Sequence, residues 1–300
     1  MFIIRLILLL AFLLFSVISL LSQGCSDAGV CSLNRMKPMF LDSNLIEKTN
    51  YLSLGLSNGK ADHSISIIGG YLEYNKKINE AFSINSKLTF SSQNGNNINT
   101  LGISDLYLST NYKLSKNISL VFGSKIPLSN GNTQINGKIL PMNYQSSLGT
   151  LDLILGLNYN FNNFNFVFAL QQPLTQNKNQ FINDSLEFVQ YQSTNKYFRN
   201  GDLMFRVSYP IEYNESLTIS PSLLPIYHLS DDSFINIMGN EVKIIGSKGL
   251  TLNLNVMLNY NLNTTNAIIF SFGSPFVTRE SRPDGLTRSY VANFEYRVSF

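Results

Sequence analysis

The sequence has no tryptophan, only two cysteines and few charged residues. Lys, Arg, Asp and Glu make up 14% of the 300 residues, against roughly 25% in an ordinary soluble domain. The formal net charge of +3 is too weak to attract a polyanion, so no nucleic-acid partner is expected. After the first 21 residues no apolar run is long enough for a membrane helix. No HExxH motif or phosphate-binding glycine loop occurs, and the sequence indicates no metal or cofactor.

Neutral amides and aromatic rings are abundant instead. The chain contains 37 Asn, 15 Tyr and 21 Phe, and 44% of its residues are hydrophobic. A disordered chain would contain far fewer hydrophobic residues, and a coiled coil would be rich in charged residues. The composition therefore indicates a folded protein of another class.

The N-terminal segment has the order of a secretory signal. Arg5 precedes an apolar run that extends with small interruptions to Leu21, and small and polar residues follow at Ser22, Gln23 and Gly24. This pattern predicts a signal peptide over residues 1–23. A permanent membrane anchor is the alternative, because the run is close to the length that spans a bilayer.

Cys25 and Cys31 lie just after the expected cleavage site. In an exported protein they predict a disulfide that closes a short loop. The alternative is a lipoprotein in which Cys25 is acylated. Residues 24–49, which contain both cysteines, are expected to be either a periplasmic lead-in or a small hatch inside the barrel.

From about residue 50 the sequence alternates between apolar and polar residues. The clearest segment is Thr251–Asn263, TLNLNVMLNYNLN, in which Leu and Tyr share one face and Asn the other, with only Met257 out of place. In a helix this pattern would scatter the apolar groups, whereas in a strand it makes one oily and one amide face. The body of the chain is therefore predicted to be all-β.

The connections between these strands alternate between short and mostly longer segments. A soluble sandwich also alternates along its strands, but it has no reason to sort its loops in this way. Outer-membrane barrels combine short periplasmic turns with long external loops. Short links are expected at 75–80, 115–117, 162–163, 214–216 and 263–266, and the others at 58–62, 91–100, 128–149, 172–200, 229–249 and 277–287.

These patterns predict a closed antiparallel transmembrane β-barrel over residues 50–300, in the outer membrane of a Gram-negative bacterium. Phe300 on the apolar face of the last strand resembles the C-terminal signal that the barrel-assembly machinery reads. The expected partners are therefore this machinery, outer-membrane lipid and a small-molecule solute. Ten or fourteen strands remain possible beside the twelve expected at 50–57, 63–74, 81–91, 101–114, 117–127, 150–161, 164–172, 201–213, 216–228, 250–262, 266–276 and 288–300.

The inner face of such a barrel would be polar. Twelve strands enclose a backbone diameter of roughly 24 Å and leave a pore near 10 Å or less. Charges of both signs would line it, so strong ion selectivity is not expected. An alternative is that these charges pair across the lumen and hold it shut. The residues expected to line the lumen are Lys87, Asp105, Tyr107, Lys113, Asp152, Arg206, Glu212, Glu295 and Arg297.

Both histidines are expected near the outer rim, and each has an acidic neighbour in the sequence. Asp62 precedes His63, and Asp231 and Asp232 follow His228. A His–Asp pair across the mouth could activate water, as in a hydrolase. Exposed rim histidines among ordinary loop acids are the simpler interpretation, and no catalytic residue is assigned.

Three stretches resemble the meta-pathway phenol-degradation family of bacterial outer-membrane barrels, which is distantly related to long-chain fatty-acid transporters. They are LGISDLYLSTNYKL, SSLGTLDLILGLNYNF and STNKYFRNGDLMFRVSYPI, at Leu101–Leu114, Ser146–Phe161 and Ser193–Ile211. Ser104 stands where this family usually has Gly. The resemblance covers about a third of the chain and implies a barrel that admits small, including hydrophobic, molecules.

Three functions are therefore open. The first is a porin-like channel or transporter for the passive passage of small molecules. The second is a closed barrel with a structural or adhesive role through its extracellular loops. The third and most remote is a hydrolase at the rim; the chain is otherwise expected not to be an enzyme.

Overall fold

The computed structural model describes residues 50–184, 188–285 and 288–300. The expected signal peptide at 1–23, the segment 24–49 and the Cys25–Cys31 disulfide lie outside these residues, so they stay predictions. Within the described ranges, no helix is both long and apolar enough to cross a membrane.

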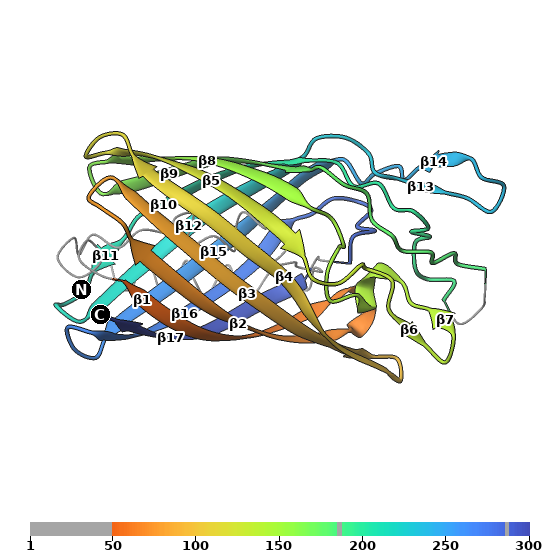
Figure 1. The fold of residues 1–300 in the computed structure, drawn as a ribbon, viewed down its shortest axis with the longest axis horizontal. Helices are drawn as coiled ribbons and strands as arrows, with labels where there is room; N and C mark the ends of the chain where they lie inside the picture. The colour runs from red at the N-terminus through yellow and green to blue at the C-terminus, as the bar shows by residue number, and fades with distance from the viewer. Residues whose placement is uncertain (1–49, 185–187, 286–287) are drawn as a thin grey trace, which may run out of the picture.

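The wall is one antiparallel sheet closed on itself (Figure 1). Its neighbours follow the order β10-β9-β8-β5-β4-β3-β2-β1-β17-β16-β15-β12, and β12 pairs with β10 to close the ring. Twelve strands therefore form the wall within the described chain. They are β1 Tyr51–Ala61, β2 Ser66–Lys77, β3 Phe82–Gly95, β4 Ile98–Lys113, β5 Ile118–Pro127, β8 Asp152–Phe161, β9 Phe164–Pro173, β10 Asp202–Ser208, β12 Leu217–His228, β15 Gly249–Asn261, β16 Asn266–Val277 and β17 Arg288–Ser299.

Short elements accompany the wall. β11 extends the line of β10 beyond Tyr209 and Pro210 and pairs with β12. The two remaining hairpins and two 3-10 turns belong to the loops. These elements are β11 Ile211–Glu212, hairpin β6 Gln134–Ile135 with β7 Lys138–Ile139, hairpin β13 Ser233–Ile235 with β14 Glu241–Lys243, η3 Asp62–Ser64 and η4 Met142–Tyr144.

Alternation along each strand sorts the side chains between the two faces of the wall. On β15, Leu254 is 50% exposed on the outside, whereas Asn253 is fully buried on the inside. Met257, which interrupts the amide row in the sequence, also faces inward and is 5% exposed. The outer surface is therefore a belt of Leu, Ile and Phe, which lipid covers and water does not. The protein is a closed antiparallel transmembrane β-barrel.

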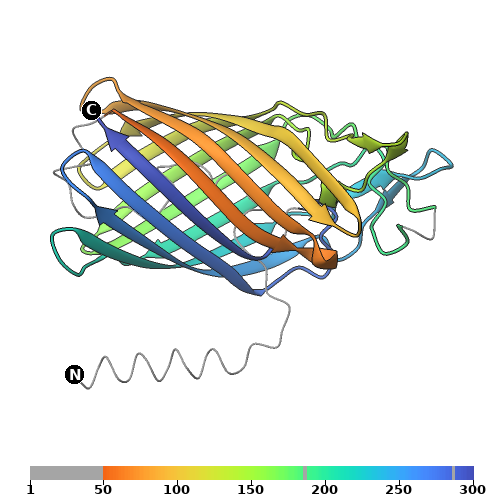
Figure 2. The ribbon, with the colours of Figure 1, turned by 90° about the horizontal axis from the view of Figure 1, so that it is seen from below.

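The first and last strands of the barrel close the wall against each other (Figure 2). β1 pairs with β17 from Tyr51 opposite Ser299 to Ala61 opposite Arg288, with one register shift near Lys60. Phe300 adds a hydrogen bond from its backbone N–H to the carbonyl of Asn50. No free strand edge remains on the barrel wall at this seam.

The two ends of the barrel differ in their connections (Figure 1). One end has the tight turns, including Asn162 and Asn163 between β8 and β9, and it carries the C-terminal residue. Outward aromatic side chains ring this end and give the girdle that anchors a barrel at the interface. They include Tyr112, Tyr159, Phe161, Phe164, Tyr213 and Tyr260. The other end carries the long loops 128–151, 174–201, 229–248 and 278–287.

Two expected connections of the loop end are shorter than the sequence indicated. The loop predicted at 91–100 is a two-residue turn at Asn96 and Asn97, because both residues adopt the positive φ values that such hairpins require. β1 likewise continues to Ala61 and leaves only η3 as its turn. The predicted strand 201–213 is instead interrupted at Pro210, since proline cannot donate to a ladder.

Candidate functional site: the lumen and its mouth

Most of the residues expected to line the lumen are buried on the inside of the wall. Lys113 is half-buried and Glu212 is exposed, and both lie at the turn end of the barrel. The other seven are at most 9% exposed: Lys87, Asp105, Tyr107, Asp152, Arg206, Glu295 and Arg297.

A first group of polar residues lies on β1, β2, β3 and β17. The carboxylate of Glu295 accepts a hydrogen bond from the Arg297 guanidinium at 2.6 Å and from the Tyr71 hydroxyl at 2.6 Å. Glu73 accepts from the Tyr51 hydroxyl at 3.0 Å and lies 4.0 Å from the Lys87 ammonium. Lys87 also lies over the Tyr71 ring, 3.8 Å from its centre. Opposite charges are therefore matched along this part of the wall.

A second group lies nearer the loops, on β4, β5 and β8 and in the loop 128–151. The Lys125 ammonium is 2.8 Å from the Asp152 carboxylate, and the Thr150 hydroxyl donates to the same carboxylate at 2.6 Å. Ser147 donates to Asp105 at 2.6 Å. Lys125 and Asp152 are opposite each other in the register of two adjacent strands. These pairs thus run along the wall between adjacent strands, rather than across the lumen as in the alternative drawn from the sequence.

One section of the inner wall is apolar, which the sequence analysis did not foresee. The side chains come from β4, β5, β8, β9, β10 and β12 and pack together with at most 7% exposure. The uninterrupted apolar run Phe166–Leu170 was the signal for this, because it makes both faces of β9 hydrophobic. The cluster consists of Tyr107, Val121, Ile154, Val167, Ala169, Met204, Leu224 and Ile226.

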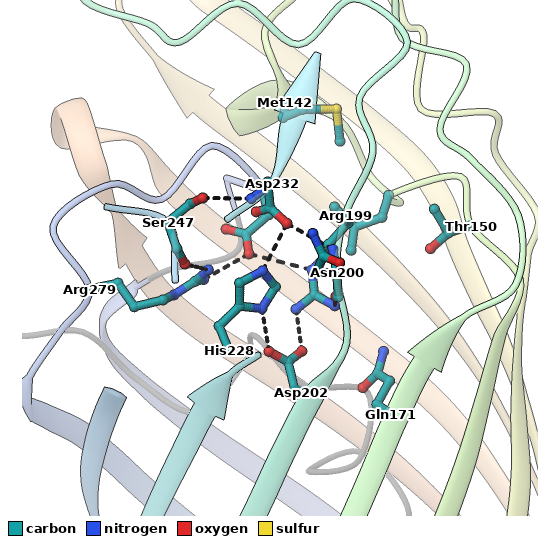
Figure 3. Close-up of polar contacts among 12 residues, drawn as sticks. Met142, Thr150, Gln171, Arg199, Asn200, Asp202, His228, Asp232, Ser247 and Arg279 are labelled. Carbon is teal, nitrogen blue, oxygen red and sulfur yellow. Dashed lines mark hydrogen bonds and ion pairs between the residues drawn. The ribbon is translucent and has the colours of Figure 1, made fainter. Parts of the chain in front are cut away.

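A buried cluster of charged residues lies at the loop end of the lumen (Figure 3). Asp202 and His228 are opposite each other at the ends of β10 and β12. One ring nitrogen of His228 lies 2.6 Å from the Asp202 carboxylate, and the other lies 2.8 Å from that of Asp232. Arg199 contacts Asp202 at 2.5 Å. His228 is 1% exposed and Asp232 is fully buried.

The cluster extends into a third loop through Asp284. The Arg279 guanidinium donates to the Asp284 carboxylate at 2.9 Å, and Arg199 lies 3.6 Å from it. The Tyr197 hydroxyl donates to Asp232 at 2.6 Å. Arg279 also donates to the backbone carbonyl of Ser247 at 2.9 Å. We call Arg199, Asp202, His228, Asp232, Arg279 and Asp284 the mouth cluster.

The protonation of His228 sets the charge balance of the mouth cluster. Both ring nitrogens face carboxylate oxygens, and each contact is a hydrogen bond only if that nitrogen carries a proton. A doubly protonated imidazole and two guanidinium groups balance the three aspartates, so the cluster is then neutral. Burial opposes ionisation of Asp284, but Arg279 and Arg199 outweigh it and hold the pKa of its carboxyl below the ordinary value.

The mouth cluster connects the loops 174–201, 229–248 and 278–287. A separate ion pair, Arg282 with Asp62 at 3.0 Å, ties the last of these loops to the turn between β1 and β2. At the same turn the His63 ring packs on Tyr191, whose hydroxyl lies 3.1 Å from that of Tyr144, and Asn96 donates to Tyr191 at 2.9 Å. The loops thus form a connected cover over the loop end.

The two rim histidines have different surroundings in the structure. His63 is exposed and packs against the Tyr191 ring at 4.7 Å, while its neighbour Asp62 pairs with Arg282. His228 is paired with Asp232 as the sequence order suggested. Its other nitrogen faces Asp202, so both ring nitrogens are paired with carboxylates.

The arginines of the mouth cluster were missed because nothing in their local sequence marks them. Arg199, Arg279 and Asp284 come from two loops that are about 80 residues apart in the chain. Only the closure of the barrel brings these loops together. Phe300 lies at the seam as its position predicted, and its role as an assembly signal stays a prediction.

Comparison with known proteins gives similarities of shape only. No protein-family model and no curated protein matches the sequence. Similar solved structures include the NanC porin, with 11% identity over 84% of this chain and 98% of that one at a TM-score of 0.44. They also include the CymD monoaromatic hydrocarbon channel, with 10% identity over 92% and 94% at 0.44.

A further similar structure is a FadL homologue from Pseudomonas aeruginosa, with 12% identity over 84% of this chain and 90% of that one at a TM-score of 0.44. At such low identity and TM-score, these likenesses assign no function to this chain. The similarity to the phenol-degradation family therefore stays a resemblance, and function rests on the geometry of the lumen and mouth.

Proposed function

We propose that this barrel is a passive outer-membrane channel for small molecules, including molecules with a hydrophobic part. The observation that carries the proposal is the division of the inner wall. Charged side chains such as Lys125 and Asp152 are matched along the wall, while a separate section around Ile154 and Leu224 is apolar.

This division suits uncharged solutes that have both polar and hydrophobic groups. Matched charges give little net field for selecting one sign of ion, because each charge is screened by its own partner. An apolar section lowers the cost of carrying a hydrophobic group through an otherwise polar lumen, since that group leaves water on contact with it. Movement would follow the concentration gradient alone.

The mouth cluster would set how far the loops open. It holds three loops together through buried, charge-assisted hydrogen bonds, which are stronger than neutral ones. Solute entry from the loop end would then depend on this cover. This supports a channel whose permeability is limited at the mouth.

Swelling of proteoliposomes tests the proposal. Purified protein is refolded into vesicles and its folded state is checked by its heat-dependent migration in SDS gels. We expect vesicles to swell in neutral solutes of small size and to stop swelling as the solute approaches the estimated pore width. Vesicles without protein are the control. Folded protein that admits no solute of any size would overturn the channel.

A second candidate is a structural or adhesive role for the outer loops. The tip of the β13–β14 hairpin exposes Ile237 at 77% and Met238 at 79%, and Ile245 follows at 75%. Exposed apolar groups of this size outside the lipid belt are typical of contact surfaces. Replacing Ile237 and Met238 by Ser should then abolish adhesion of cells that display the protein, with unchanged swelling of vesicles. Unchanged adhesion would dismiss this surface.

A further inference from the structure

Four neighbouring side chains on the inner wall carry polar atoms that have no hydrogen-bond partner. They are the hydroxyl groups of Ser220 and Ser222 on β12, the Asn253 side-chain oxygen and the Asn255 side-chain nitrogen on β15. Ser220 and Asn253 are fully buried, and Ser222 is 6% exposed. Native proteins pair nearly all such groups, so several on two adjacent strands need an explanation.

The strand register brings these groups together. Ser222 is directly opposite Asn255, and Leu224, two residues further along β12, is opposite Asn253. The Asn253 amide nitrogen donates to the Leu224 carbonyl at 3.2 Å. This bond fixes the orientation of the amide, and it leaves the side-chain oxygen as the free acceptor.

A glycine on the next strand makes room for Asn255. Gly273 of β16 is opposite Asn255 in the register. A Cβ atom at Gly273 would lie 2.2 Å from the Asn255 side-chain oxygen, which is far inside van der Waals contact. The position of the Asn255 amide therefore depends on the absence of a side chain at residue 273.

The chemistry of the four groups defines what they can bind. Two hydroxyls, one amide oxygen and one amide nitrogen offer donors and acceptors but no charge. The apolar section begins next to them, because Leu224 and Ile226 follow Ser222 on the same inner face of β12. A matching ligand has hydroxyl groups on one side and C–H groups on the other, and carries no charge.

We propose that Ser220, Ser222, Asn253 and Asn255 form a binding site inside the barrel for an uncharged, hydroxyl-bearing small molecule of monosaccharide size. Its hydroxyl groups pair with these four side chains, and its C–H face packs on Leu224. The inference rests on the proposed channel function, because a solute reaches these buried groups only through the lumen.

The main competing outcome is that the site binds an anion, and Arg206 is the residue that would favour it. It faces inward on β10, the strand that pairs with β12 on the other side. A cationic guanidinium in this wall would favour an anion over a neutral molecule. A test with size-matched solutes of different charge separates the two.

Calorimetric titration of the folded protein in detergent provides this test, with D-glucose, D-gluconate and D-glucosamine as probes. We expect saturable binding of glucose and about tenfold weaker binding of both charged probes, since none of the four proposed side chains carries a charge. Tighter binding of gluconate than of glucose, or no binding of any probe, would overturn the neutral site.

Two variants alter the site from different strands. The Ser220→Ala/Ser222→Ala double variant removes both hydroxyls, and Gly273→Ala displaces the Asn255 amide. Each should weaken glucose binding about tenfold, roughly the effect of losing one or two neutral hydrogen bonds. Ser86→Ala, on the outer face of β3, is the matched control and should bind as the parent does.

Failure of this site and failure of the channel give different results. Absence of glucose binding in protein that still makes vesicles swell rejects the site and leaves the channel intact. Absence of swelling rejects the channel whatever the calorimetry shows. Heat-dependent gel migration of every variant confirms that it is folded, and glucose affinity in the serine variants equal to that in Ser86→Ala would overturn the residue assignment.

Discussion

At the scale of single residues, His228 determines whether the mouth cluster is balanced. Its two ring nitrogens face the carboxylates of Asp202 and Asp232. Arg199 contacts Asp202 as well, and Arg279 contacts Asp284. Taking a buried cation away leaves uncompensated buried carboxylates, which is among the most destabilising changes a protein can suffer. The imidazole thus links the end of β12 to Asp202 on β10 and to Asp232 in the loop 229–248.

Replacing His228 by Leu should loosen these loops and destabilise the loop end by about 3–5 kcal/mol. Limited trypsin digestion should then cut the loops of the variant much faster than those of the parent. His63→Leu is the matched control, because His63 is exposed and outside the mouth cluster. Equal digestion of the two variants would contradict the assigned role of His228.

The same digestion should depend on pH in the parent protein. At low pH the imidazole carries both protons and makes both hydrogen bonds. As the pH rises one proton is lost, and one nitrogen then faces a carboxylate oxygen without a hydrogen between them. Digestion should become faster as the pH rises from mildly acidic to mildly alkaline, relative to a control substrate. His228→Leu should lack this step.

Asp284 should respond in the opposite direction. Its pKa is held below the ordinary carboxyl value mainly by Arg279 and Arg199 acting against burial. Its stabilising contribution is therefore present above the ordinary carboxyl pKa and is lost as the pH falls through the lowered one. Asp284→Asn should remove this acid-dependent loosening and make the loops more open to protease at neutral pH. A variant as resistant as the parent would refute the role of Asp284.

At the scale of elements, Tyr71 of β2 crosses β1 to reach β17. Its hydroxyl donates to Glu295, and a Cβ atom at Gly55 of β1 would lie 2.1 Å from its ring. The absence of a side chain at Gly55 therefore lets the Tyr71 ring lie across β1 and reach β17. This contact adds a side-chain tie to the backbone ladder of β1 with β17.

Gly55→Val should displace the Tyr71 ring and weaken this closure. Overpacking of a well-filled site costs about 1–3 kcal/mol, to which the lost hydrogen bond adds. The temperature at which the barrel loses its compact migration in SDS gels should fall. Leu54→Val, an adjacent change on the lipid-facing side, is the control and should shift it little. Equal temperatures for both would mean that Tyr71 does not tie the seam.

The strands were predictable because alternation is a local property. Each of the twelve expected segments overlaps a wall strand, and the Leu and Asn faces of Thr251–Asn263 lie outside and inside as the pattern requires. The sequence predicts a long loop at 91–100 where the structure has a two-residue turn at Asn96 and Asn97, because polar residues at the end of an extended hairpin resemble loop residues. The apolar section was missed for a related reason: Ile154 and Met204 are isolated among polar inward neighbours.

The mouth cluster could not have been predicted from one sequence. Arg199 and Asp202 are close in the chain, but Arg279 and Asp284 reach them only through the closed ring of strands. His228 and Asp232 could be paired from their spacing, yet their burial depends on loops from elsewhere. Chemistry of this kind is a product of topology and has no local signature.

At the scale of the whole molecule, the barrel combines a uniform lipid-facing surface with an interior divided into apolar and polar sections. In the proposed channel, the connected loops would then be the main barrier to a solute at that end. Permeability and loop stability should accordingly change together, because the same contacts set both.

His228→Leu should therefore raise the swelling rate of vesicles in a small neutral solute several-fold over the parent. His63→Leu, reconstituted at the same protein-to-lipid ratio, should not. Loops that become sensitive to protease without any gain in swelling would show that the mouth cluster does not limit passage. The barrier to solute passage would then lie elsewhere along the lumen.

The seam between β1 and β17 also has a consequence for biogenesis. Tyr71 and Glu295, which meet across it, are 224 positions apart in the chain, and contacts of such range form late because a long loop must first be ordered. Until the last hairpin is synthesised, the chain has unpaired strand edges, including that of β1, which β17 later covers. Chaperones that escort it would be needed most during that interval, and premature termination anywhere before Arg288 should yield aggregates rather than a smaller pore.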